Sequence, residues 1–185
     1  MRSRILVAKR SRAARRGEEY ISGYTFPADI EGRVRGKLPQ LDDIGWARVE
    51  EGLREWFVCC AWRGRTVLGM PSRAVDEAWH EFILDSVPYS SFCEQAFGGY
   101  LHHTPDESQA GSMDDLYAHT VGAWDRSEEG HGVRESVLWD LDHHLEIEDP
   151  SGLSEEQLKL VRGRNAQQPP HDWALPADSY WIWRT

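Results

Sequence analysis

Apolar residues recur at spacings of three and four along most of the chain, which is the period of an amphipathic α-helix. The longest such stretch predicts a helix from about Leu41 to Trp62, with Asp42 or Asp43 as its N-cap and Gly64 as its stop. Its apolar positions are Leu41, Ile44, Val49, Leu53, Trp56, Phe57 and Cys60.

Shorter stretches with the same period follow, and no strand pattern is convincing outside residues 65–68. The pattern therefore predicts a mainly α protein, with a single compact helical domain of about five to six helices. The further predicted helices are 71–85, 88–97, 112–124, 133–145 and a last short one capped by Ser154 and Gln157.

The two ends of the chain differ from this helical domain, which we place at residues 19–165. Residues 166–185 form a tail rich in tryptophan and proline, expected to be irregular and packed on the domain. Residues 1–18 contain few large apolar side chains and are expected to form a basic flexible arm.

The charge of the chain is divided unevenly between this arm and the rest. Residues 1–16 of the arm carry seven of the 21 basic residues and no acidic one, which leaves 14 basic against 31 acidic residues in the remainder. An acidic body repels nucleic acid and anionic membranes, so contact with nucleic acid is expected only through the arm. The candidate phosphate-binding residues are Arg2, Arg4, Lys9, Arg10, Arg12, Arg15 and Arg16.

Cysteine content and hydropathy bear on the compartment. Three cysteines, two of them adjacent at Cys59 and Cys60, do not form a disulfide framework, and packing in a helical core is the favoured interpretation of that pair. No apolar run is long enough to cross a bilayer, and the N-terminal one is too short for a signal peptide. We therefore expect a cytoplasmic protein that does not enter a membrane.

Residues 70–105 concentrate groups that bind metals or move protons within an otherwise core-forming stretch. Asp76 and His80 are four residues apart and so share one face of the predicted helix. Cys93 lies on the next helix, and of the adjacent His102 and His103 at most one faces inward if the chain is extended there.

Zinc takes cysteine, histidine and aspartate ligands, whereas iron favours two histidines with a carboxylate. The sequence thus predicts a zinc or iron site around His80, with His103, Cys93 and Asp76 as companions in that order and His102 as a further candidate. Whether such a metal is structural or catalytic stays open, and no reaction or substrate follows from the sequence.

Two other interpretations stand beside the metal site. In the first, which we call the polar-staple interpretation, His80 donates a hydrogen bond to Asp76 or to a backbone carbonyl and so fixes how two helices meet. Cys93 is then a small buried hydrophobe. In the second, the protein is a non-enzymatic interaction module, whose acidic body or tryptophan-rich tail docks a protein while its basic arm contacts nucleic acid. The pair His143 and His144 is expected on an exposed helix face.

The same segment resembles a known family. The run VDEAWHEFIL, followed by Phe92-Cys93, Phe97-Gly98 and the HHTP motif ending at Pro105, is similar to a bacterial family of uncharacterised proteins. The likeness extends over residues 24–148. It is also distantly similar, over 75–103, to the helical module of plant glycine-rich-domain proteins, although the chain lacks their glycine-rich region. Neither resemblance implies an established activity, but both emphasise Trp79, His80, Cys93 and His103.

Overall fold

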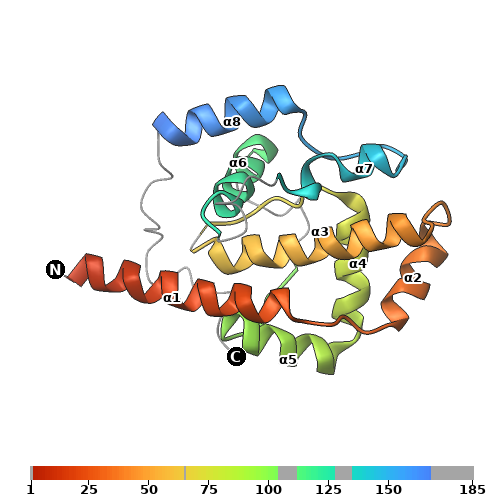
Figure 1. Cartoon of the computed structure of the whole chain (residues 1–185), viewed down its shortest axis with the longest axis horizontal. Coiled ribbons are helices and arrows are strands. Elements are labelled where there is room, and N and C mark those ends of the chain that lie inside the picture. Colours follow the sequence, from red (N-terminus) through yellow and green to blue (C-terminus); the bar gives the residue numbers. More distant parts are fainter. Residues whose placement is uncertain (1, 65, 104–111, 128–134, 168–185) are drawn as a thin grey trace.

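The computed structural model describes residues 2–64, 66–103, 112–127 and 135–167, with side chains from residue 12 onward. Within these ranges the chain is all-helical, which confirms the predicted mainly α fold (Figure 1). The helices are α1 (Arg2–Ser22), α2 (Asp29–Lys37), α3 (Asp43–Trp62), α4 (Arg73–Leu84), α5 (Ser86–Phe97), α6 (Met113–Trp124), the 3-10 helix η2 (Val137–Trp139), α7 (Leu141–His144) and α8 (Glu155–Gln167).

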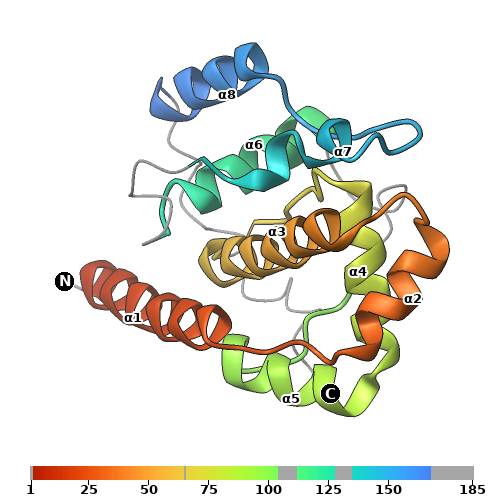
Figure 2. The same cartoon turned by 45° about the vertical axis from the view of Figure 1, so that its right-hand side comes forward.

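Helix α3 is the central element of the fold. It contacts α1, α4, α6, α7 and η2, and α8 packs outside α6 (Figure 2). Because it is surrounded, α3 buries residues on most of its circumference, including Trp56, Phe57 and Cys59. Cys59 and Cys60 are buried free thiols, which confirms the predicted core packing of this pair.

The predicted helix boundaries hold where a side chain caps the helix. The Asp42 carboxylate accepts from the Gly45 N–H at 2.7 Å, which decides between the two predicted caps of α3. Ser72 caps α4, and Ser112 and Ser154 cap α6 and α8 as predicted. Helix α5 begins at Ser86, two residues before the predicted start, and ends at Gly98 in the left-handed region with φ 74°.

The structure differs from the predicted elements in three places. The helix predicted over 133–145 is wrong for its described part, which forms only η2 and the single turn α7. Helix α2 was not predicted, since only Ile30 and Val34 of its nine residues are buried. Residues 66–68 form no strand. Of the predicted tail, residues 166–167 form the end of α8, and residues 168–185 lie outside the described residues.

The predicted arm is also helical in the structure. Helix α1 passes through residue 18, where the arm was expected to end, and its first half extends beyond α3 and α5 (Figures 1 and 2). The close approach of α1 to α5 begins at Gly17, where an added Cβ would lie 2.3 Å from the carbonyl oxygen of Ala96. Trp62 then donates to the buried carboxylate of Glu18 at 2.5 Å. The packed body therefore starts at residue 17.

An aromatic cluster fills the space between α1, α3, α4 and α5. Phe92 of α5 is its centre and is fully buried. Its ring packs against those of Tyr20, Tyr24, Phe26, Phe57, Phe82 and Phe97, with centroid distances of 4.7–6.2 Å. This cluster joins α5 to α4 and so fixes the two helices that carry the candidate site residues. Among the described residues, no helix is both long and apolar enough to cross a membrane.

Candidate metal site

One cluster of potential ligands forms in the described part of the chain, and it consists of Asp76, His80 and His103. One ligand atom from each of the three lies within 4.8 Å of the other two. The His103 Nε2 is 3.0 Å from one carboxylate oxygen of Asp76, and the His80 Nδ1 is 3.6 Å from the other. The two imidazole rings lie with centroids 4.2 Å apart and planes tilted by 46°.

Helix α4 places two of these side chains by its periodicity alone. Asp76 and His80 are one turn apart on a face next to the buried stripe of Val75, Trp79 and Phe82. The site is therefore half-buried, with side-chain exposures of 32% for Asp76, 44% for His80 and 19% for His103. The more exposed His80 marks the side from which solvent reaches the cluster.

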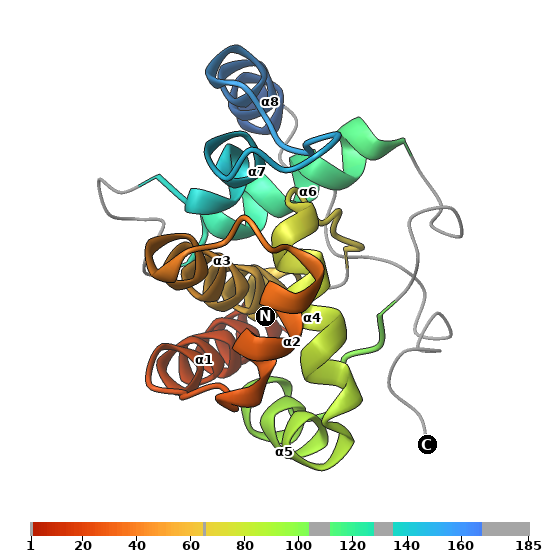
Figure 3. The same ribbon diagram turned by 90° about the vertical axis from the view of Figure 1, so that its right-hand side faces the viewer.

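The third side chain comes from the segment that follows α5 and passes beside α4 (Figure 3). Residues 101–103 belong to no helix or strand, and their side chains alternate. Leu101 and His103 face the protein, whereas His102 is exposed and stacks on Tyr100 at a centroid distance of 4.8 Å. Of the two adjacent histidines, His103 is thus the one that joins the cluster.

Cys93 does not belong to this cluster. It is fully buried on α5, and burial raises the pKa of its thiol, an effect that hydrogen bonds with the Leu101 backbone and with Tyr89 only partly offset. A thiol with a raised pKa stays protonated and is a poor metal ligand. The structure therefore places Cys93 beside the hydroxyl of Tyr89, and not with the other predicted ligands.

The polar residue Asp142 fixes the N-terminus of α4 and was not singled out in the sequence. Its buried carboxylate accepts hydrogen bonds from the Ser72 hydroxyl at 2.6 Å and from the backbone N–H groups of Arg73, Ala74 and Ser151 at 2.8–3.2 Å. It lies in the acidic stretch for which an exposed helix face was expected. That expectation holds for His143 and His144, which are exposed.

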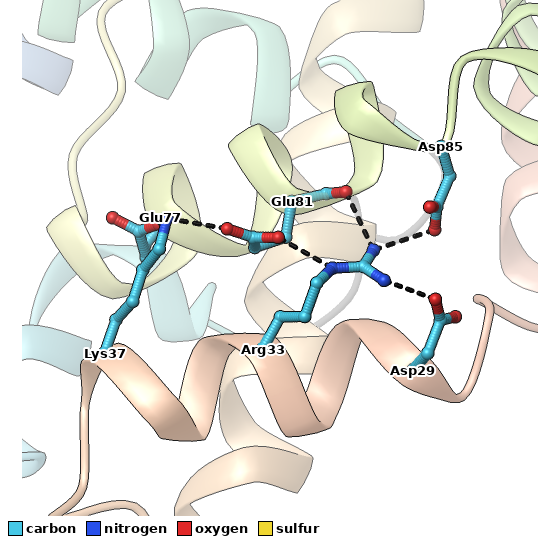
Figure 4. A network of polar contacts seen from close by, with 6 residues as sticks. All are labelled: Asp29, Arg33, Lys37, Glu77, Glu81 and Asp85. Atoms are coloured by element: carbon cyan, nitrogen blue, oxygen red, sulfur yellow. Dashed lines mark hydrogen bonds and ion pairs between the residues drawn. The ribbon is translucent and has the colours of Figure 1, made fainter.

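A network of ion pairs joins α4 to α2 (Figure 4). The Glu81 carboxylate forms ion pairs with Arg33, at 2.7 Å from its Nε, and with Lys37, at 2.6 Å from its Nζ. Arg33 also pairs with Asp29 and Asp85, and Lys37 with Glu77. Glu81 is the buried member of the network, so its two cationic partners compensate its charge.

This network predicts a pH-dependent contribution to stability. The Lys37 hydrogen bond, with a smaller one from Arg33, lowers the pKa of Glu81 in the folded protein. A lowered pKa stabilises the fold above the unfolded pKa, about 4.3 for glutamate, and this contribution disappears as the pH falls through the folded pKa. We expect Glu81→Gln to reduce the free energy of unfolding by about 1–3 kcal/mol at pH 7.

Denaturant unfolding at a series of pH values checks this expectation. The difference between wild type and Glu81→Gln should shrink below about pH 4, where the wild-type carboxylate also becomes neutral. The matched control is Glu94→Gln on the exposed face of α5, which should change stability little at any pH. A deficit of Glu81→Gln that persists unchanged at pH 3 would contradict an ionic origin.

Fold and site together define an all-helical domain with a carboxylate and two imidazoles gathered on one helix and its neighbouring segment. Residues 16–157 match the profile of a family described as UCP032817-like, and the chain belongs to this family. No curated protein and no solved structure matched the chain. The match confirms the resemblance to an uncharacterised family, whereas the likeness to the plant module stays a prediction.

The family match contains all the cluster residues but begins at residue 16, after most of the basic arm. The predicted nucleic-acid contact of the arm, the protein partner and the cytoplasmic location stay predictions.

Proposed function

We propose that the protein binds a divalent zinc or iron ion through Asp76, His80 and His103. The observation that supports this proposal is the convergence of the three side chains on one point from two separate segments of the chain. Ligand atoms about 2.0–2.1 Å from a tetrahedral ion lie about 3.3 Å apart. The His103 Nε2 lies 3.0 Å from one Asp76 oxygen and the His80 Nδ1 lies 3.6 Å from the other, on either side of that value, and one ligand atom from each of the three residues lies within 4.8 Å of the other two.

The donor set also indicates what kind of metal site this is. Two imidazoles and a carboxylate are the ligands of open three-residue sites of catalytic zinc and of non-haem iron, in which the remaining positions take water or substrate. The half-exposed His80 leaves room for such a ligand on the solvent side. An open position is what metal-assisted chemistry requires, whereas a structural zinc site is closed by four protein ligands.

Metal analysis of protein without a histidine tag tests the proposal. After loading with Zn²⁺ or, without oxygen, Fe²⁺, followed by gel filtration, we expect about one equivalent in the wild type. Both His80→Ala and His103→Ala remove one of only three protein ligands, so both should retain less than about a tenth of an equivalent.

The chain offers a matched control in His144→Ala. The His144 Nδ1 lies 3.4 Å from the carboxylate of Asp140, four residues earlier, and so repeats the Asp76–His80 arrangement, but no third ligand joins the pair in the part of the chain that the structure describes. Its removal should leave the metal content unchanged. Wild-type protein with less than a tenth of an equivalent would instead support the polar-staple interpretation, in which Asp76 only accepts hydrogen bonds from the two imidazoles.

A further inference from the structure

The backbone that carries His103 is held by a buried chain of hydrogen bonds that reaches back to α4. Tyr89 of α5 is fully buried, and its hydroxyl donates to the carbonyl oxygen of Leu101 at 2.5 Å. The same hydroxyl accepts from the indole N–H of Trp79 at 3.0 Å. Leu101, itself buried, lies two residues before His103.

Trp79 contacts both Tyr89 and the candidate ligand His103. Its indole N–H donates to Tyr89, and its ring packs against the imidazole of His103 with centroids 4.6 Å apart. It is also the residue before His80 in α4. Two hydrogen bonds that share the Tyr89 hydroxyl therefore connect the Leu101 carbonyl to Trp79 of α4. They tie the backbone next to His103 to the helix that carries Asp76 and His80.

From this arrangement we infer that Tyr89 is a positioning residue of the metal site, an inference that rests on the proposed function. Tyr89 does not touch the ion; it fixes the Leu101 carbonyl, and thereby His103, at the distance from Asp76 and His80 that a common ion requires. Asp76 and His80 are held in place by helix α4, whereas residues 101–103 belong to no helix or strand. The hydrogen bond from Tyr89 to Leu101 holds this segment instead. Outer groups of this kind orient metal ligands and tune affinity.

Removal of the hydroxyl alone isolates this role. Tyr89→Phe keeps the ring that packs on Phe82 and Tyr100, but leaves the Leu101 carbonyl and the Trp79 N–H buried without their partner. These two groups regain hydrogen-bond partners only if residues 101–103 shift or water enters. Either change displaces His103. Because a metal site tolerates displacements of only about 0.5 Å, the affinity for the ion falls.

Cobalt(II) is a suitable probe, because its visible absorption reports both occupancy and ligand geometry. We expect Tyr89→Phe to weaken Co²⁺ binding about tenfold to a hundredfold and to change the absorption bands of the bound ion. The matched control is Tyr100→Phe, which removes a hydroxyl from a tyrosine that contacts the Tyr89 and His102 rings. It should bind Co²⁺ as the wild type does.

A double-mutant cycle separates positioning from a general loss of stability. In a His103→Ala background, Tyr89→Phe should weaken the residual Co²⁺ binding no further, since its effect passes through His103. An equal further loss in that background, or wild-type affinity of Tyr89→Phe, overturns the positioning role while leaving the metal site in place. Failure of the wild type itself to bind Co²⁺ removes the proposed function and this inference together.

Discussion

Asp142→Ala is expected to lower the free energy of unfolding by about 3–5 kcal/mol, because it removes a buried acceptor on which four hydrogen-bond donors converge. The Asp142 carboxylate is 1% exposed and accepts four hydrogen bonds, of which two come from backbone N–H groups in the first turn of α4. Alanine leaves these donors without their acceptor, and each donor that stays buried and unsatisfied costs about 1–3 kcal/mol; the Ser72 hydroxyl and the Ala74 N–H are the buried ones.

Chemical denaturation of the two variants Asp142→Ala and Asp140→Ala measures this effect against a close control. Asp140 lies two residues earlier and is exposed, and within the described residues its ion pair is with His144, so its loss should cost less than about 1 kcal/mol. Similar small losses in both variants would refute the anchoring role of Asp142. Because the anchor holds the start of α4, Asp142→Ala should also reduce metal retention by the folded protein.

Phe92→Ala is expected to destabilise the protein by about 3–5 kcal/mol, as is typical when a fully buried phenylalanine is truncated and a cavity remains. Its ring contacts six other aromatic rings from four segments of the chain, and so many rigid neighbours cannot collapse into the space that alanine leaves. Phe92→Leu, which retains most of the volume, should cost only about 1–2 kcal/mol.

Thermal and urea unfolding of this series checks the cavity argument. Val87→Ala on the same helix is a suitable control, since Val87 is 79% exposed and its truncation should change stability by less than about 0.5 kcal/mol. A loss for Phe92→Leu as large as that for Phe92→Ala would point to aromatic contacts and not to volume as the source of stability.

The sequence predicts the helices whose buried side is wide and whose ends are capped. Helix α3 follows from its apolar period together with Asp42 and Gly64, and α6 from Ser112 and Asp115. Helix α2 escapes prediction because its order comes from tertiary ion pairs such as Glu81 with Arg33 and Lys37, whose partners lie about 40–50 residues away. Residues 137–144 have a helical apolar pattern, but the positive φ of 51° at Glu146 shows that the chain has already turned there.

The candidate site is predictable to the extent that it depends on periodicity. The spacing of Asp76 and His80 places them on one face, and strand-like alternation lets one of His102 and His103 face inward. That His103 joins the cluster, and that Cys93 does not, depends on how α5 and the segment after it pack against α4. No local sequence pattern encodes this packing. The roles of Tyr89 and Asp142 were missed for the same reason, although a tyrosine within an otherwise apolar helix face is a signal that its hydroxyl has a buried partner.

Some buried hydrogen bonds join residues that are far apart in the sequence, and this separation affects how the protein folds during synthesis. Glu55 in the middle of α3 accepts from the Ser136 hydroxyl and the Val137 N–H, 81 and 82 residues later in the chain. These two donors reach the buried carboxylate of the central helix only after most of the chain has left the ribosome. A peptide comprising residues 70–105 would contain every cluster residue and still lack the aromatic neighbours from α1 and α3, so we expect the three side chains to converge only within the folded domain.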